Sequence, residues 1–251
     1  MKIKAFLKEN LGFLLFLAIF GAVGGYFTSL WSFETISEEM LAETLAMVGS
    51  ESVLILIGIV QVLLYSVVLG LIGKILAEKV GLWRELTFDK KGIISVVAVS
   101  LIGGVALILP DAFIFSQFSE AIADSYLQKP TITYIITSLT YGGVVEEVMM
   151  RLFLMSAVAF IISRFRTNKE ATEGILVLSN VIVALIFAAG HLPATEMTLG
   201  LSIPLLIRCF FLNGVFGLAF GYLYRKHGIF YAMLAHCGVH IVSKLIWLIF
   251  I

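Results

Sequence analysis

The sequence predicts an all-α fold, a polytopic bundle of about seven transmembrane helices with an active site inside the membrane. Hydrophobic residues make up 60% of the 251 residues and charged residues only 14%, whereas about a quarter of the residues in a soluble domain are charged. The mean hydropathy is +1.05. Such a chain is an integral membrane protein, and the first partner that we expect for it is membrane lipid.

Seven apolar stretches are long enough to cross a bilayer as helices, for which roughly 18 or more residues are needed. They cover approximately residues 10–31, 52–74, 92–115, 131–163, 174–192, 200–224 and 228–250. The first stretch is longer than the apolar core of a cleaved signal peptide, and we interpret it as the first span. No soluble domain or internal repeat is visible, so the sequence predicts a single membrane domain over residues 1–251.

The connecting segments alternate in charge. Of the 17 Lys and Arg residues, 13 fall in the N-terminal segment and every second connection, one falls in the other connections, and three lie within spans. Connections rich in Lys and Arg remain in the cytoplasm. The pattern predicts a cytoplasmic N-terminus and, after seven crossings, a C-terminus outside. The formal net charge is zero, which gives no electrostatic reason to expect nucleic acid as a partner.

Two connections carry apolar residues of their own. Residues 33–48 predict an acidic amphipathic helix at the outer interface, and residues 84–91 predict an interfacial element on the inner side. The cysteines, Cys209 and Cys237, lie within apolar stretches without a metal-binding or redox spacing, and we interpret them as small core residues.

The fourth span carries three ionisable residues, Glu146, Glu147 and Arg151. Each costs on the order of 2.5–3.5 kcal/mol to place at bilayer depth, so they indicate a functional site. Glu147 and Arg151 are four residues apart, the spacing of a helical ion pair. Glu146 is turned about 100° away on an α-helix and has no partner there. This predicts a neutralised Glu147 and a free Glu146, although a purely architectural triad stays an alternative.

Histidines occur near the ends or within two later spans. His191 closes the fifth span and is either a helix-end residue or part of a site. His236 and His240 lie four residues apart on one face of the seventh span, a spacing that favours a metal site or a shared catalytic face. His227 lies beside Arg225 and is interpreted as a solvated side chain at the inner boundary.

These clusters, in this order, resemble the signature of the CAAX prenyl proteases and bacteriocin-processing membrane proteases (the Abi, or CPBP, family, type II CAAX endopeptidase-like). That signature is Glu-Glu-x-x-x-Arg, then Phe-x-x-x-His, then His-x-x-x-Asn or Asp, each on a separate transmembrane helix. Glu146, Glu147 and Arg151 match the first motif completely, and Phe187 and His191 match the second.

The third motif departs from the pattern, because His236 is followed by His240 where the family has Asn or Asp. The resemblance covers roughly residues 130–245, which we expect to form the catalytic core. It implies the plasma membrane of a bacterium or archaeon and a peptide or protein substrate, prenylated or not. The sequence makes no prediction of the oligomeric state.

The resemblance implies an intramembrane endopeptidase of the glutamate type. Glu146 is expected to activate a water molecule with the help of His191, and His236 with His240 to stabilise the oxyanion. Glu147 and Arg151 are then the supporting ion pair.

The resemblance also implies that the reaction needs no metal cofactor. Zinc is the alternative, because Glu146, His191, His236 and His240 are also a chemically plausible ligand set.

Two other classes of function remain open at this stage. Chains of Glu and His within spans also serve proton-coupled transporters, and a non-catalytic immunity or scaffold protein keeps the fold without the activity. Arg208 and Lys244, which also lie within spans, receive no chemical role from the sequence.

Overall fold

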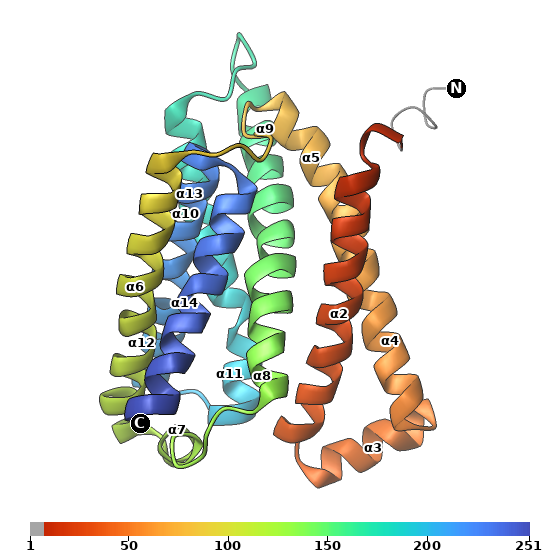
Figure 1. Ribbon diagram of the computed structural model, residues 1–251, viewed down its shortest axis with the longest axis vertical. Helices are drawn as coiled ribbons and strands as arrows, with labels where there is room; N and C mark the ends of the chain where they lie inside the picture. The colour runs from red at the N-terminus through yellow and green to blue at the C-terminus, as the bar shows by residue number, and fades with distance from the viewer. Residues whose placement is uncertain (1–7) are drawn as a thin grey trace.

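The structure, a computed structural model, describes residues 8–251, and within that range every regular element is helical (Figure 1). The first three spans are α2 (Leu11–Thr35), then α4 (Glu51–Leu64) with η1 (Tyr65–Leu69) and α5 (Gly70–Lys79), then α6 (Lys90–Phe113). The fourth consists of α8 (Ile132–Thr137), η3 (Ser138–Glu146), η4 (Val148–Met155) and α9 (Ser156–Arg164).

The remaining spans are α10 (Glu173–Gly190), then α12 (Ile203–Phe210) with η5 (Phe211–Val215) and α13 (Phe216–His227), then α14 (Ile229–Phe250). Short helices lie in the connections: α3 (Glu38–Val48), η2 (Phe115–Phe118), α7 (Glu120–Ser125) and α11 (Leu192–Leu199). The long helices run side by side, and α2 begins at the end of the bundle opposite to the end of α14 (Figure 1).

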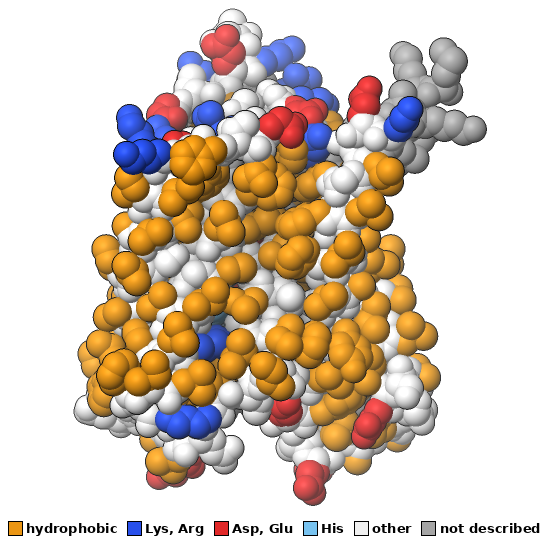
Figure 2. Space-filling model, in the orientation of Figure 1, with side chains coloured by type: hydrophobic (Ala, Val, Ile, Leu, Met, Phe, Trp, Pro, Cys, Tyr) orange, Lys and Arg blue, Asp and Glu red, His pale blue; other side chains and the backbone are white. Residues whose placement is uncertain are grey.

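The membrane bundle predicted from the sequence is confirmed. Within residues 8–251, six helices are long and apolar enough to cross a membrane. The other predicted span, residues 131–163, is helical from Ile132 onward but contains Glu146, Glu147 and Arg151. Large apolar side chains face outward, such as Ile102 at 71% exposure. Figure 2 shows them as a broad band, with Lys and Arg gathered mainly beyond its upper edge.

The first of the two predicted interfacial elements differs from expectation. The helix expected over residues 33–48 begins only at Glu38, because α2 continues to Thr35 and the Ser37 hydroxyl then caps α3 by accepting a hydrogen bond from Met40 N at 3.2 Å. Residues 82–89 form no helix. There Asp89 ends an irregular segment and caps α6, accepting from Lys91 N at 3.0 Å.

Glycines allow the fourth span to pack closely against its neighbours. A Cβ on Gly73 of α5 would lie 2.8 Å from the Leu152 carbonyl carbon, and a Cβ on Gly143 would lie 3.3 Å from the Cα of Cys237 in α14. Small residues at such crossings let backbones approach. Cys237 and Cys209 are free thiols that donate to carbonyls of Leu139 and Ala188, in agreement with their interpretation as core residues.

Arg208, which received no role from the sequence, is paired within the bundle. Its guanidinium makes a two-pronged contact with Asp111 at the end of α6, at 2.5 Å and 2.8 Å. The Tyr126 hydroxyl donates to the same carboxylate at 2.9 Å. This cluster ties α12 and the α7 connection to α6.

His227 was interpreted as a solvated side chain, and this is wrong. Its Nδ1 lies 2.5 Å from the Asp89 carboxylate, while the Asp89 amide donates to the Tyr231 hydroxyl at 2.8 Å. The turn between α13 and α14 is therefore fastened to the start of α6. The hydrogen bond from His227 holds the pKa of Asp89 below its usual range.

Asp89→Asn is expected to lower the thermal unfolding temperature modestly at neutral pH, since asparagine caps a helix equally well but has no charge for His227. The pKa of Asp89 is lower in the folded protein than in the unfolded chain. Its contribution is therefore complete above the ordinary carboxyl pKa and is lost as the pH falls through the lower folded value.

Thermal unfolding in detergent micelles from about pH 7 to about pH 3 checks this, because carboxyl groups titrate at the lower end of that interval. The difference between wild type and variant should close at the acidic end. A difference that is constant over the whole interval contradicts the assignment.

Candidate active site

The fourth span brings a carboxylate and a guanidinium together in the protein interior. Glu147 and Arg151 are almost fully inaccessible to solvent, and Arg151 Nη1 donates to Glu147 Oε1 at 3.0 Å. The ion pair expected from their four-residue spacing is present. Burying both charges is costly, and their mutual attraction offsets that cost only if the geometry is good and further hydrogen bonds follow.

The helix that carries this pair is unusual in its hydrogen bonding. The segments on both sides of Glu147, η3 and η4, are π-helical, so their backbone hydrogen bonds join residues five apart. Short π segments are often found at functional sites. The two segments contain or flank Glu146, Glu147 and Arg151. The sequence predicts an ordinary α-helix for these residues.

Glu147 has a second partner that the sequence did not predict. His236 of α14, 89 positions later, places Nδ1 at 2.8 Å from the same oxygen, Glu147 Oε1. A carboxylate only accepts, so the ring nitrogen is the donor, and a neutral His236 then has its lone pair on Nε2. Glu147 is thus a junction between the fourth and seventh spans.

Glu146 differs from Glu147 in its burial and in its hydrogen bonding. It is partly buried, and among residues 8–251 the structure shows no hydrogen bond or ion pair to its carboxylate. The predicted division of the two glutamates, one paired and one unpaired, agrees with this geometry.

Aromatic rings from two other spans cover the guanidinium. The carbon atom at the centre of the Arg151 guanidinium lies 4.6 Å from the centre of the Phe187 ring and 5.6 Å from that of Phe220. Such contacts stabilise a cation that has left water. Phe187 belongs to the Phe-x-x-x-His motif, whereas nothing in the sequence marked Phe220.

The same two rings connect Arg151 to the histidines. His191 packs edge-on against Phe187, with ring centres 4.7 Å apart, and its Nδ1 donates to the Phe187 carbonyl at 2.8 Å. Because a carbonyl only accepts, neutral His191 keeps its lone pair on Nε2. On the other side, Phe220 stacks on His236 with ring centres 4.3 Å apart.

His236 and His240 stack on each other with ring centres 5.0 Å apart, as their four-residue spacing predicts. Both rings direct Nε2 towards Gly142 of η3. A Cβ there would lie 3.2 Å from His240 Nε2 and 4.0 Å from His236 Nε2. The absence of a side chain at residue 142 therefore leaves room beside both nitrogens.

Lys244 completes the row of polar groups on α14. It is buried, with 5% of its surface exposed. Its Nζ lies 3.4 Å from His240 Nδ1 and 4.3 Å from the centre of the Tyr134 ring. The contact with His240 places Lys244, which received no chemical role from the sequence, next to the stacked pair of histidines.

The residues considered as a zinc set are not assembled as one. Within residues 8–251, no group of three or more His, Cys, Asp or Glu side chains has the arrangement needed to hold a metal ion. The Nε2 lone pairs of His236 and His191 would suit a metal, since each Nδ1 donates to Glu147 or to a carbonyl, but the side chains are not gathered into one ligand set. We therefore derive no chemical step through zinc.

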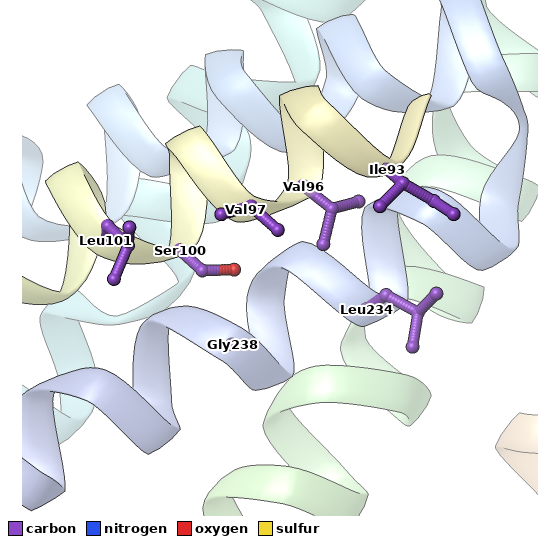
Figure 3. A pocket seen from close by; sticks show the side chains of 7 residues that line it. All are labelled: Ile93, Val96, Val97, Ser100, Leu101, Leu234 and Gly238. Atoms are coloured by element: carbon purple, nitrogen blue, oxygen red, sulfur yellow. The ribbon is translucent and has the colours of Figure 1, made fainter. Parts of the chain in front are cut away.

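An apolar groove lies on the lipid-facing side, separate from these residues. It measures about 360 Å³ and is formed by α6 and α14 (Figure 3). Its lining is Ile93, Val96, Val97, Ser100, Leu101, Leu234 and Gly238. None of the ionisable residues of the fourth and seventh spans lines it, so it carries no chemistry of its own.

Comparison with known protein families gives a match over the part of the chain that carries the three motifs. Residues 128–242 match the family model described as Rce1-like, type II CAAX prenyl endopeptidase Rce1-like. This interval contains all three motifs and nearly coincides with the core expected over residues 130–245. Searches of curated proteins and of solved structures returned no match. Residues 128–242 are thus similar to the Rce1-like family of type II CAAX prenyl endopeptidases.

Proposed function

We propose that this protein is an intramembrane endopeptidase that hydrolyses a peptide bond of a membrane-associated peptide or protein, prenylated or not. The observation that carries the proposal is the contrast between two adjacent carboxylates. Glu147 is engaged by Arg151 and His236, which leaves Glu146 as the acid that is available to a water molecule.

In the proposed reaction, Glu146 accepts a proton from water while the water oxygen attacks the carbonyl carbon of the substrate. His191, whose Nδ1 is held by the Phe187 carbonyl, offers Nε2 as a second acceptor that orients this water. The proton on Glu146 then passes to the leaving amine as the carbon–nitrogen bond breaks. Atoms and charges balance without a redox partner.

The negative oxygen of the tetrahedral intermediate needs a hydrogen-bond donor. We propose that it lies beside Gly142, where Nε2 of His240 and Nε2 of His236 converge. Neutral His236 has its proton on Nδ1 and donates from Nε2 only if the ring is protonated. His240 is therefore the principal donor, and Glu147 with Arg151 supports the arrangement.

The orientation in the membrane is part of the proposal. The basic connections, which gather at the upper end of the bundle in Figure 2, favour a cytoplasmic N-terminus and an outside C-terminus. The acidic α3 connection is then outside.

Glu146→Gln is expected to lower the turnover number by about 10²–10⁴-fold, the usual contribution of a general base. The unfolding temperature should not fall, because no hydrogen bond or ion pair is lost. The measurement is cleavage of two matched peptides in lipid vesicles, one prenylated on a cysteine near its C-terminus and one carrying an acyl anchor instead.

Glu43→Gln is the matched control, since Glu43 is an exposed acid of α3. This variant should cleave the peptides at the wild-type rate. If wild type cleaves neither peptide, the transporter and non-catalytic alternatives gain support. The assay is repeated after chelator treatment with elemental analysis, and activity that depends on bound zinc contradicts the metal-free mechanism.

Arg151→Met is expected to destabilise the fold by about 3–5 kcal/mol, because it leaves the buried Glu147 carboxylate without its cation. Adding Glu147→Gln should restore most of this stability by removing the orphaned charge. Activity should stay low in the double variant, since His236 has lost its carboxylate. Unfolding in denaturant and peptide cleavage are measured together. A double variant that regains full activity would show that the pair has only a structural role.

The orientation is tested by thiol labelling of intact cells with a membrane-impermeant reagent. Glu43→Cys in α3 should be labelled, whereas Thr167→Cys, in the exposed connection after α9, should be labelled only after the membrane is permeabilised. The native cysteines, Cys209 and Cys237, donate to carbonyls within the bundle and give the background. The reverse result places α3 in the cytoplasm and refutes the orientation.

A further inference from the structure

We propose that Lys244 is a positioning residue that fixes the tautomer of His240, so that the ring presents an N–H at Nε2 to the site. The inference rests on the proposed function for its catalytic meaning, because it assigns the origin of the oxyanion donor. It concerns a residue that no motif marks and that touches neither the ion pair nor the groove.

The surroundings of Lys244 are unusual for a lysine. It is buried in α14 within a span, and among the described residues it forms no ion pair with a carboxylate. Its Nζ faces the Tyr134 ring at 4.3 Å, a contact that favours the charged amine. A buried lysine without a carboxylate partner is costly, and such residues within spans mark functional positions.

The hydrogen bond between Lys244 and His240 determines the chemistry of the histidine ring. Its Nζ lies 3.4 Å from His240 Nδ1. The Tyr134 ring favours the ammonium form of Lys244, and in that form Nζ has three donors and no acceptor. His240 Nδ1 then accepts and does not carry the proton of a neutral ring. The proton is then on Nε2, the nitrogen that faces Gly142 at 3.2 Å from the position of an added Cβ.

The neighbouring histidine has the opposite tautomer for the same reason. Glu147 accepts from His236 Nδ1 at 2.8 Å, so neutral His236 carries its lone pair on Nε2. Two stacked imidazoles, 5.0 Å apart, thus offer one acceptor and one donor to a single space. The difference arises from the charge behind each ring, a carboxylate for His236 and an ammonium for His240.

The tautomer is measured directly by ¹⁵N NMR of histidine-labelled protein in micelles, with His240→Asn used to assign the His240 signals. In wild type, His240 should show a protonated Nε2 and an unprotonated, hydrogen-bonded Nδ1. In Lys244→Met, the Nδ1 signal should move and an Nδ1–H form should appear. A wild-type ring protonated on Nδ1 overturns the proposal, whether or not the protein cleaves any peptide.

The kinetic test uses the fact that an asparagine amide has an N–H in every state. Lys244→Met should lower the turnover number about tenfold with little change in KM, a fraction of the 10²–10³-fold effect of deleting an oxyanion donor. In the His240→Asn background, the same substitution should change the turnover number less than about twofold, because no tautomer remains to be fixed. Equal losses in both backgrounds overturn the proposal.

Two measurements keep a folding defect separate from a positioning effect. Methionine is flexible and apolar and fits buried sites well, and the unfolding temperature of each variant is recorded. Lys129→Met is the matched control, since Lys129 also contacts α14 through the Trp247 carbonyl at 3.4 Å but has no contact with a histidine. It should leave both the His240 signals and the cleavage rate unchanged.

Discussion

One oxygen atom, Oε1 of Glu147, accepts from both Arg151 on its own helix and His236 on α14. An ionised carboxylate in this interior is stable only with such donors, because the desolvation of the charge must be offset. The same contacts orient the rest of the site. Arg151 is held where Phe187 and Phe220 cover it, and the His236 ring is turned so that Nε2 faces Gly142. Removing this oxygen would therefore affect four spans together.

The proposed catalytic glutamate, Glu146, and the supporting glutamate, Glu147, are neighbouring residues of one helix. Glu147 faces the interior with two partners, while Glu146 is left without a hydrogen bond or ion pair in the described structure. Close packing makes this possible, since Gly143 lets the fourth span approach Cys237 of α14 and brings His236 within reach. The ring nitrogen that carries the proton then depends on the group that contacts Nδ1. That group is a carboxylate for His236, a carbonyl for His191 and an ammonium group for His240.

The sequence predicted the features that depend on local spacing. The helix bounds agree with the apolar stretches to within a few residues, and the contact of Glu147 with Arg151 followed from a four-residue step. Contacts between distant segments were not predictable in this way. The bonds from His236 to Glu147 and from His227 to Asp89, and the cover given by Phe220, depend on how helices cross. The π-helical bonding around Glu147 has no signature in residue type, because the same apolar residues form α-helices elsewhere in the chain.

The long separation between Glu147 and His236 has a consequence for biosynthesis. Arg151 emerges from the ribosome four residues after Glu147. The fourth span therefore enters the membrane with a cation for the Glu147 carboxylate on the same helix. His236 is 89 residues further along, and α14 follows the other described helices in the order of synthesis. Until it arrives, one hydrogen bond to Glu147 is missing and the face of η3 around Gly142 and Gly143 is open. Assembly of the site is therefore tied to synthesis of α14, and a nascent protein that lacks this helix carries the acidic residues without the arrangement that uses them.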